Sequence, residues 1–306
     1  MTRVGPGFDW GQRAPRWAGI ASRVVDIRGT RVHYLRAGRH IDGPTHLLVH
    51  PMGMGAWSWM DVIGPLAARG LVIAPDLPGS GRSRPLRRGT GDVVAGAAFL
   101  DAFTAALGVE RMVVHGHSMG GLVGGVLGGR FPDRVERLVL TSAPLPGLSD
   151  PVPFPDAWTV GLRVLRPVAD VLVGAGLRLK ADAWRRRVEE RDLRLGTEMA
   201  RVSPELLSLA ADEIGRLQRR WRVEGAVDGA ISVVRALTVD EARTREALHS
   251  ITAPTLLLWG AEDRVIPQRL IVEVEAAYPG WSSRTNEGVG HLLPWEAPGL
   301  YVELAG

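Results

Sequence analysis

Short apolar runs bounded by turn residues recur along the chain, and their lengths suit buried strands. We expect a strand in each of eight runs: residues 24–27, 32–35, 47–50, 71–74, 112–115, 138–141, 255–259 and 282–285. Helix-length segments lie between several of these runs, at residues 59–69, 92–107, 119–130 and 268–278. Because parallel strands are joined by such crossovers, the pattern predicts an α/β fold with a mostly parallel eight-stranded sheet flanked by helices.

The N-terminal part of the chain departs from this rhythm. A short segment around Arg28-Gly29-Thr30 joins the first two runs, which suits a hairpin and predicts an antiparallel start to the sheet. Residues 1–21 before them show no periodicity. They are either a mobile arm or a strap over the core, and the sequence leaves both open.

The strand rhythm stops between residues 145 and 240. This stretch opens with a group of prolines and then becomes helix-like, and Ser203-Pro204-Glu205 has the form of a helix N-terminus with proline in the first turn. We therefore expect a helical cap, residues 145–240, inserted into a core made of residues 1–144 and 241–306. Whether the cap opens and closes is not indicated.

The composition is that of an ordinary globular protein, with 45% hydrophobic and 23% charged residues. The absence of cysteine excludes disulfides, thiolate metal sites and a cysteine nucleophile. Although the pI is 10.2, the net charge is only +4, and the arginines of residues 145–240 alternate with acidic residues, which favours a solvated surface and no nucleic-acid partner. The first residues contain no continuous apolar stretch, so we expect a cytoplasmic location and no membrane insertion.

The segment most informative about chemistry is Gly116-His117-Ser118-Met119-Gly120, between a predicted strand and a predicted helix. It matches G-x-S-x-G in the context that this motif requires. A serine on a sharp strand-to-helix turn projects its hydroxyl above the sheet, and the two glycines leave room for the turn. Alone, the segment is equally compatible with a glycine-rich turn of no chemical role or one that binds phosphate, so the other motifs must decide.

Four further motifs lie before and after this segment. Together with it, their order resembles that of the α/β-hydrolase family over nearly the whole chain. They are His50-Pro51-Met52-Gly53, similar to the family's oxyanion loop; residues 76–83, similar to its D-x-x-G-x-G-x-S turn; Trp259-Gly260-Ala261-Glu262-Asp263, where its acid usually sits; and Gly290-His291 with Pro294, Glu296 and Pro298, similar to its terminal histidine loop. Motifs in this order are more specific than any one of them.

The resemblance implies a catalytic triad of Ser118 as nucleophile, Asp263 as acid and His291 as base, in the chain order of the family. A serine hydroxyl is a weak nucleophile, so His291 must accept its proton during attack and return it to the leaving group. Asp263 would fix the histidine tautomer and stabilise the imidazolium. The resemblance also implies that the backbone N–H groups of Met52 and Met119 form the oxyanion hole.

One residue departs from the family pattern, because proline stands at position 51 where the family has glycine after the loop histidine. Proline has no N–H and a fixed φ, but the donor that the oxyanion hole needs belongs to Met52. Proline at position 51 is therefore compatible with an oxyanion hole. The sequence does not indicate which shape the loop takes.

Other side chains near the motifs are candidates for supporting roles. His50 is expected to brace the oxyanion loop, His117 and His115 to pack or form hydrogen bonds, and Glu262 to be a neighbour of the acid rather than the acid itself. The histidines show no metal-ligand spacing, so neither a metal nor a cofactor is expected. The candidate pocket residues are His50, Trp57, Trp59 and Trp295.

The resemblance implies hydrolysis of a carboxylic ester of a small to medium, largely apolar molecule through an acyl-enzyme on Ser118. Serine at this position argues against the dehalogenases and epoxide hydrolases of the family, whose pattern has aspartate there. C–C bond hydrolases, lactonases, thioesterases and perhydrolase-like members share the triad, so the reaction subclass stays open. A non-hydrolytic biosynthetic enzyme or a ligand receptor is the alternative of another class, although a complete triad favours hydrolysis. The oligomeric state is not indicated.

Overall fold

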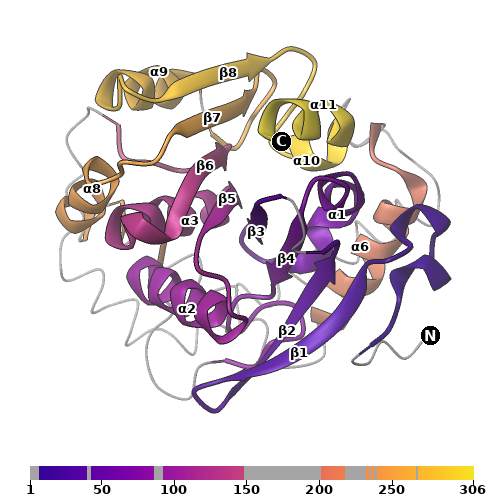
Figure 1. Cartoon of the computed structure of the whole chain (residues 1–306). Helices are drawn as coiled ribbons and strands as arrows, with labels where there is room; N and C mark the ends of the chain where they lie inside the picture. The colour runs from indigo at the N-terminus through magenta and orange to yellow at the C-terminus, as the bar shows by residue number, and fades with distance from the viewer. Residues whose placement is uncertain are drawn as a thin grey trace, which may run out of the picture.

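An eight-stranded sheet forms the centre of the molecule (Figure 1). The structure is a computed structural model, and it describes residues 7–39, 43–85, 92–147, 201–217, 232–233, 236–237, 240–266 and 268–306. The strands are β1 (Ala21–Ile27), β2 (Thr30–Ala37), β3 (Thr45–Val49), β4 (Leu71–Pro75), β5 (Met112–His117), β6 (Val135–Thr141), β7 (Thr255–Gly260) and β8 (Ser282–Asn286). Their order is β1-β2-β4-β3-β5-β6-β7-β8, and β2 runs opposite to the other seven strands. The predicted, mostly parallel sheet is confirmed.

The hairpin predicted at the start of the sheet is also confirmed. β1 and β2 pair antiparallel along the whole of β1. The two residues between them, Arg28 and Gly29, have φ values of 52° and 80°, the left-handed conformation that matches the twist of two-residue hairpins. The carboxylate of Asp26 accepts the N–H of Gly29 at 2.7 Å.

Helices cover both faces of the sheet (Figure 1). One face carries α2 (Val93–Ala106), α3 (Met119–Arg130), α8 (Glu241–His249) and α9 (Gln268–Ala277), and the other carries α1 (Met60–Ala67), α10 (Leu293–Glu296) and α11 (Pro298–Ala305). The helices predicted from the sequence correspond to α1, α2, α3 and α9. α1 begins later than predicted, because Trp59 belongs to the 3₁₀ turn η3 (Ala56–Trp59).

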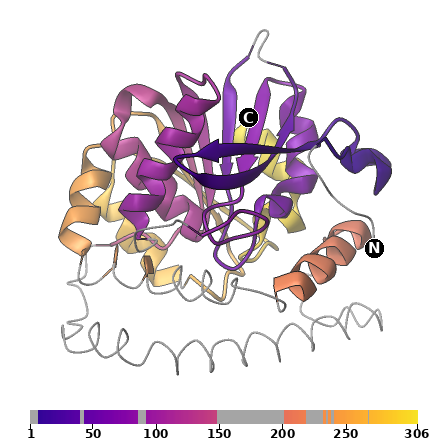
Figure 2. The ribbon, with the colours of Figure 1, turned by 90° about the horizontal axis from the view of Figure 1, so that it is seen from below.

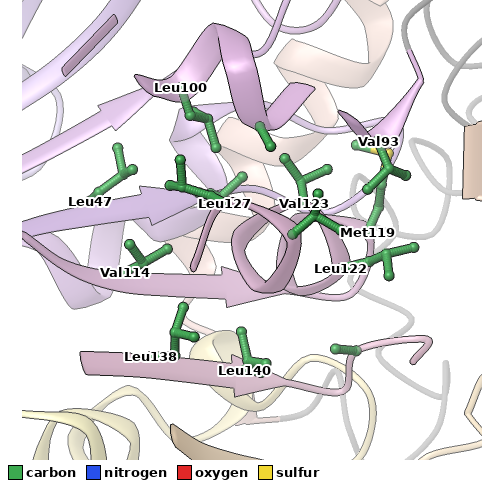
Figure 3. Packing of buried hydrophobic residues seen from close by; sticks show 14 of the residues in the cluster. Leu47, Val93, Leu100, Val114, Met119, Leu122, Val123, Leu127, Leu138 and Leu140 are labelled. Carbon is green, nitrogen blue, oxygen red and sulfur yellow. The ribbon is translucent and has the colours of Figure 1, made fainter. Parts of the chain in front are cut away.

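Alternate residues of the central strands point to opposite faces and build two hydrophobic clusters. Leu47 of β3, Val114 of β5 and Leu138 of β6 point toward α2 and α3 (Figure 3). Leu48 and Val139, each next to one of these residues in sequence, belong to the cluster on the α1 side. Because both faces are buried, the strands are continuous apolar runs in the sequence.

Residues 7–20 form a strap that connects the core to α6 (Pro204–Leu217), and α6 lies beside this segment in Figures 1 and 2. The strap contains the 3₁₀ turns η1 (Trp10–Gln12) and η2 (Pro15–Trp17), whose tryptophans are buried. Arg16 pairs with Asp61 of α1 at 2.8 Å and with Glu205 of α6 at 2.6 Å. The described part of the N-terminal segment is therefore a strap and not a mobile arm.

Most of the predicted cap, residues 145–240, lies outside the described residues, so the division into domains stays a prediction. α6 is the main described element of this region. It begins at Pro204 as the sequence indicates, and the hydroxyl of Ser203 accepts the N–H of Leu206 at 3.3 Å. In the described part of the chain, no helix combines the length and the apolar surface needed to cross a lipid bilayer.

Candidate active site

Ser118 occupies the turn between β5 and α3, with φ 53° and ψ −123°. Such a conformation is rare for a residue with a side chain and costs about 1–3 kcal/mol. The neighbouring glycines are required by crowding: a Cβ at Gly116 would lie 2.4 Å from the carbonyl oxygen of Gly120, and a Cβ at Gly120 would lie 2.2 Å from that of Val49. The N–H of Ser118 donates to the carbonyl of Thr141 at 2.8 Å. The serine is thereby held at the carboxyl end of β5.

Two backbone N–H groups lie at the same edge of the sheet. Met119 is the first residue of α3, and the first N–H groups of a helix have no intrahelical acceptor and carry partial positive charge. Met52 lies on the loop after β3, which is next to β5 in the sheet. Within the described part of the chain, neither N–H group donates to a backbone carbonyl. Their position suits an oxyanion hole, and that role stays a prediction.

His50 holds the loop that carries the Met52 N–H. Its buried ring donates from Nδ1 to the carbonyl of Pro51 at 2.8 Å and accepts the N–H of Leu77 at Nε2, 3.0 Å away. An accepting Nε2 requires the neutral ring, and burial lowers the pKa of His50. The Pro51 carbonyl and the Met52 N–H belong to one trans peptide and point in opposite directions. The ring therefore fixes the direction of the N–H, and proline at position 51 is compatible with a fixed loop.

Asp76 secures the far end of the oxyanion loop. Its carboxylate accepts the N–H of Ala56 at 2.6 Å and that of Arg82 at 2.7 Å, and Nδ1 of His33 lies 2.7 Å away. Burial raises the pKa of Asp76, but the His33 ring and the backbone donors outweigh it and hold the pKa at about 2. A Cβ at Gly81 would lie 2.1 Å from the carboxyl carbon, which explains a glycine there. The D-x-x-G-x-G-x-S turn is thus a support for the loop.

The structure brings Asp263 and His291 together, with Nδ1 of the ring 2.8 Å from Oδ2 of the carboxylate. Oδ1 accepts the N–H of Val265 at 2.8 Å and that of Ile266 at 2.9 Å. Burial raises the pKa of Asp263, but the hydrogen bond to His291 and the two backbone donors lower it by more. The carboxylate is therefore ionised at neutral pH and holds the ring with Nδ1 protonated, which leaves Nε2 as the proton acceptor.

Ser118, Asp263 and His291 follow β5, β7 and β8, so all three lie at the carboxyl edge of parallel strands. In the described residues, the Ser118 hydroxyl and the His291 ring are not joined by a hydrogen bond. In substrate-free sites such bonds are often long and tighten only when substrate binds. The elbow and the acid–base pair thus match the predicted arrangement, while the catalytic role of each residue stays a prediction.

The candidate pocket tryptophans pack in the hydrophobic cluster beside the site. Trp57, Trp59 and Trp295 are 5%, 1% and 1% exposed. The rings of Trp57 and Trp295 are 5.5 Å apart between centroids, and Trp59 packs edge-on against His117 at 6.2 Å. These rings support the site from inside the core, and a role in lining the substrate pocket stays a prediction for them and for the buried His50.

The sequence motif includes Glu296 but assigns it no role. In the structure Glu296 is buried, and its carboxylate accepts the N–H of Gly290 at 2.8 Å and the N–H of Leu292 at 2.9 Å. A glutamate between apolar residues just after a predicted catalytic loop is a usable signal, because a buried carboxylate needs hydrogen-bond donors. Among the described residues, no group of three or more histidine and acidic side chains is arranged to hold a metal ion.

Comparison with known proteins assigns this geometry to a family. Residues 45–298 match the family described as the alpha/beta hydrolase fold. The chain belongs to this family. The matched span includes the elbow and the loops of Asp263 and His291, so the resemblance expected from the motifs is confirmed.

Several relatives of known name match most of the chain. The dihydrolipoyllysine-residue acetyltransferase component of the acetoin cleaving system of Cupriavidus necator is 29% identical over 293 residues, which are 91% of this chain and 66%, just under two thirds, of that protein. The pimeloyl-[acyl-carrier protein] methyl ester esterase of Pectobacterium atrosepticum is 30% identical over 260 residues, 84% of this chain and 91% of that protein. The structure of Cfl2 from Burkholderia cenocepacia has a TM-score of 0.71 at 23% identity and covers 95% of this chain and 96% of its own.

Proposed function

We propose that the protein is a serine hydrolase that cleaves a carboxylic ester of a small to medium, largely apolar molecule through an acyl-enzyme on Ser118. The observation that carries this proposal is the pair formed by His291 and the ionised Asp263 at the same edge of the sheet as the strained Ser118 turn. A binding protein has no physical need for this combination. Backbone strain persists only where the surrounding structure enforces it, and it is concentrated at functional sites such as active sites.

In the first half of the reaction, the Ser118 hydroxyl attacks the ester carbonyl while Nε2 of His291 removes its proton. Asp263 stabilises the imidazolium that forms. The negative charge on the former carbonyl oxygen is stabilised by the N–H groups of Met52 and Met119, which are fixed before the reaction starts and need no reorganisation. Collapse of this intermediate expels the alcohol, which takes the proton from His291 and leaves the acyl group on Ser118.

In the second half, a water molecule attacks the acyl-enzyme with His291 again as base. The water loses its proton to Nε2, the oxyanion forms in the same place, and Ser118 leaves as the alcohol after the proton is returned to it. The carboxylic acid is released and the site is restored. The same groups therefore serve both steps, and no cofactor enters either of them.

Two exposed apolar side chains favour an apolar substrate. Met52, on the oxyanion loop, is 43% exposed, and Val265, two residues after Asp263, is 63% exposed. A methionine is flexible and adapts to apolar groups of different shape. The 30% identity to a protein named as a methyl ester esterase supports the ester as the bond that is cleaved.

The proposal is tested with p-nitrophenyl acetate, butyrate and octanoate, wild-type protein and the Ser118→Ala variant. We expect wild type to cleave at least one of these esters and Ser118→Ala to cleave none above the background rate. Aryl amides and an aliphatic lactone, assayed in parallel, separate ester hydrolysis from amidase and lactonase activity. Folded wild-type protein that leaves all the esters intact would contradict the proposed substrate class.

A further inference from the structure

One carboxylate contacts the chain on both sides of His291. Glu296, on α10, is 5% exposed, and its two oxygens accept the N–H groups of Gly290 and Leu292 at 2.8 Å and 2.9 Å. These N–H groups belong to the residues immediately before and after the histidine. Hydrogen bonds to a charged acceptor are roughly twice as strong as neutral ones, so this contact holds the loop firmly.

A second side chain contacts the same loop from the elbow. Nε2 of His117 lies 2.7 Å from the carbonyl oxygen of His291. Burial, together with the nearby His291 ring, lowers the pKa of His117 to about 3, so the ring is neutral at neutral pH. A carbonyl can only accept, so His117 carries its proton on Nε2 and donates it. A neutral donor suits this position, since a cation here would oppose the positive charge that His291 gains during the reaction.

Together these contacts fix two peptide groups that flank the histidine. In the peptide between His291 and Leu292, the carbonyl accepts from His117 and the N–H donates to Glu296. In the peptide between Val289 and Gly290, the carbonyl accepts the N–H of Glu262 at 3.0 Å and the N–H donates to Glu296. Each peptide plane is therefore held at both ends.

The histidine loop also packs closely against the end of β7. A Cβ at Gly260 would lie 2.2 Å from the carbonyl oxygens of both Val289 and Gly290, so the end of β7 is in close contact with the histidine loop. The acid, the base and the nucleophile are thereby connected through backbone contacts of Glu262 and the side chain of His117. A displacement of about 1 Å in such an arrangement can cost about 100-fold in rate.

We propose that His117 and Glu296 are positioning residues that hold the imidazole of His291 between the carboxylate of Asp263 and the hydroxyl of Ser118. The proposal rests on the serine hydrolase function proposed above. Neither side chain reacts. Each acts on the rate through the orientation of His291, so their loss lowers kcat and leaves KM nearly unchanged, because substrate binding does not depend on the tautomer or angle of the base.

The test uses paired substitutions that remove or retain the contact. His117→Phe keeps a ring but loses the donor, whereas His117→Gln places an amide N–H near the position of Nε2. Glu296→Ala removes both acceptors, whereas Glu296→Gln retains one carbonyl oxygen. We expect kcat to fall by about 10–100-fold in His117→Phe and Glu296→Ala, and to recover by at least half of that loss on a logarithmic scale in His117→Gln. KM should stay within about twofold of wild type, since uniform binding is not affected.

Matched controls show what a merely structural role would do. His46→Gln removes a buried histidine from β3, and Glu241→Gln removes a buried carboxylate that pairs with Arg245 on α8. Both substitutions are expected to lower stability and to leave kcat unchanged. If His117→Phe and Glu296→Ala fold and keep wild-type kcat, or if His117→Gln is as slow as His117→Phe, the proposal is wrong.

A measurement without substrate separates this proposal from the function on which it rests. The proton on Nδ1 of His291, shared with Asp263, gives a low-field proton NMR resonance when the ring is held. We expect the resonance in wild type and in His46→Gln, and its loss or broadening in His117→Phe and Glu296→Ala. Its persistence in these two variants would overturn the positioning role even if the esterase activity is confirmed. Its loss would support that role even if no ester is cleaved.

Discussion

Histidines at the carboxyl edge of the sheet and histidines in its interior differ in what their ring nitrogens contact. The edge histidines, His50, His117 and His291, contact the Pro51 carbonyl, the His291 carbonyl and the Asp263 carboxylate. The interior histidines, His46 and His115, contact each other at 2.9 Å, and His115 lies 3.1 Å from the hydroxyl of Tyr301.

The position along the strands explains this difference. Inside a parallel sheet, backbone N–H and C=O groups are already used by the ladder, so the buried side chains of His46 and His115 find partners only in other side chains. At the carboxyl ends of the strands the ladder stops and backbone groups become available. An imidazole there can orient a peptide, and thereby a catalytic group. The edge histidines are therefore expected to control rate, and the interior histidines to control stability.

The largest expected effect separates the two groups directly. His291→Ala removes the base that Asp263 holds, so kcat for a p-nitrophenyl ester should fall by about 10⁴-fold. His46→Ala should reduce the free energy of unfolding and leave kcat within a factor of about two, since no reacting group depends on it. Urea unfolding and steady-state kinetics on both variants provide the measurement. A comparable loss of kcat in the two variants would remove the distinction.

A smaller effect is expected at the oxyanion loop. His50→Phe loses the donor to the Pro51 carbonyl, so the Met52 N–H is no longer fixed, and kcat should fall by about 100-fold. His50→Asn places an amide N–H near the position of Nδ1 and should retain most of the rate. Equal rates for the two variants, with circular dichroism showing both folded, would mean that His50 does not orient this peptide.

The interior of the sheet could be predicted from the sequence more completely than the contacts at its edge. The strands were predictable because burial on both faces makes each one a continuous apolar run, as at Leu47 and Leu48. The elbow was predictable because crowding at Gly116 and Gly120 excludes other residues. The contact of His117 with the His291 loop joins residues 174 positions apart, and no local pattern encodes such a pairing. α10 is a single short turn with proline in it, which gives no helical periodicity.

The interior histidines predict a pH dependence of stability. Burial, and then the charges of Arg69 and Arg137, lower the pKa of His46 to about 4 from an ordinary value of 6.5. As the pH falls below 6.5, His46 therefore binds a proton in the unfolded chain before it does so in the folded protein. Its contribution to the free energy of unfolding is fully present above pH 6.5 and decreases as the pH falls toward about 4. At pH 5 the loss is about 2 kcal/mol.

The His46→Gln variant isolates this contribution. Between pH 7 and pH 5, the free energy of unfolding in urea should fall by about 2 kcal/mol less in this variant than in wild type. The pKa of His115 is also well below its ordinary value, first because of burial and then because of His46. The larger cause, burial, remains in the variant, so His115 still contributes to the pH dependence of both proteins. Parallel pH profiles for wild type and His46→Gln would show that His46 is not a source of the dependence.

The smallest expected effect is a gain in stability at the edge. Glycine adopts a positive φ without the strain that Ser118 carries at 53°. Ser118→Gly should therefore raise the free energy of unfolding by about 1 kcal/mol while abolishing ester hydrolysis. Ser118→Ala keeps the Cβ and should show no such gain. A thermal unfolding midpoint that is equal in the two variants would show that the elbow stores no strain.

The central claim, that Ser118 is a nucleophile activated by His291, is tested most directly by reaction with a fluorophosphonate followed by mass spectrometry. The account predicts one adduct, located on Ser118, in wild-type protein, and labelling slowed by at least about 10³-fold in His291→Ala. Folded wild-type protein that remains unlabelled, or an adduct on another residue, would contradict it.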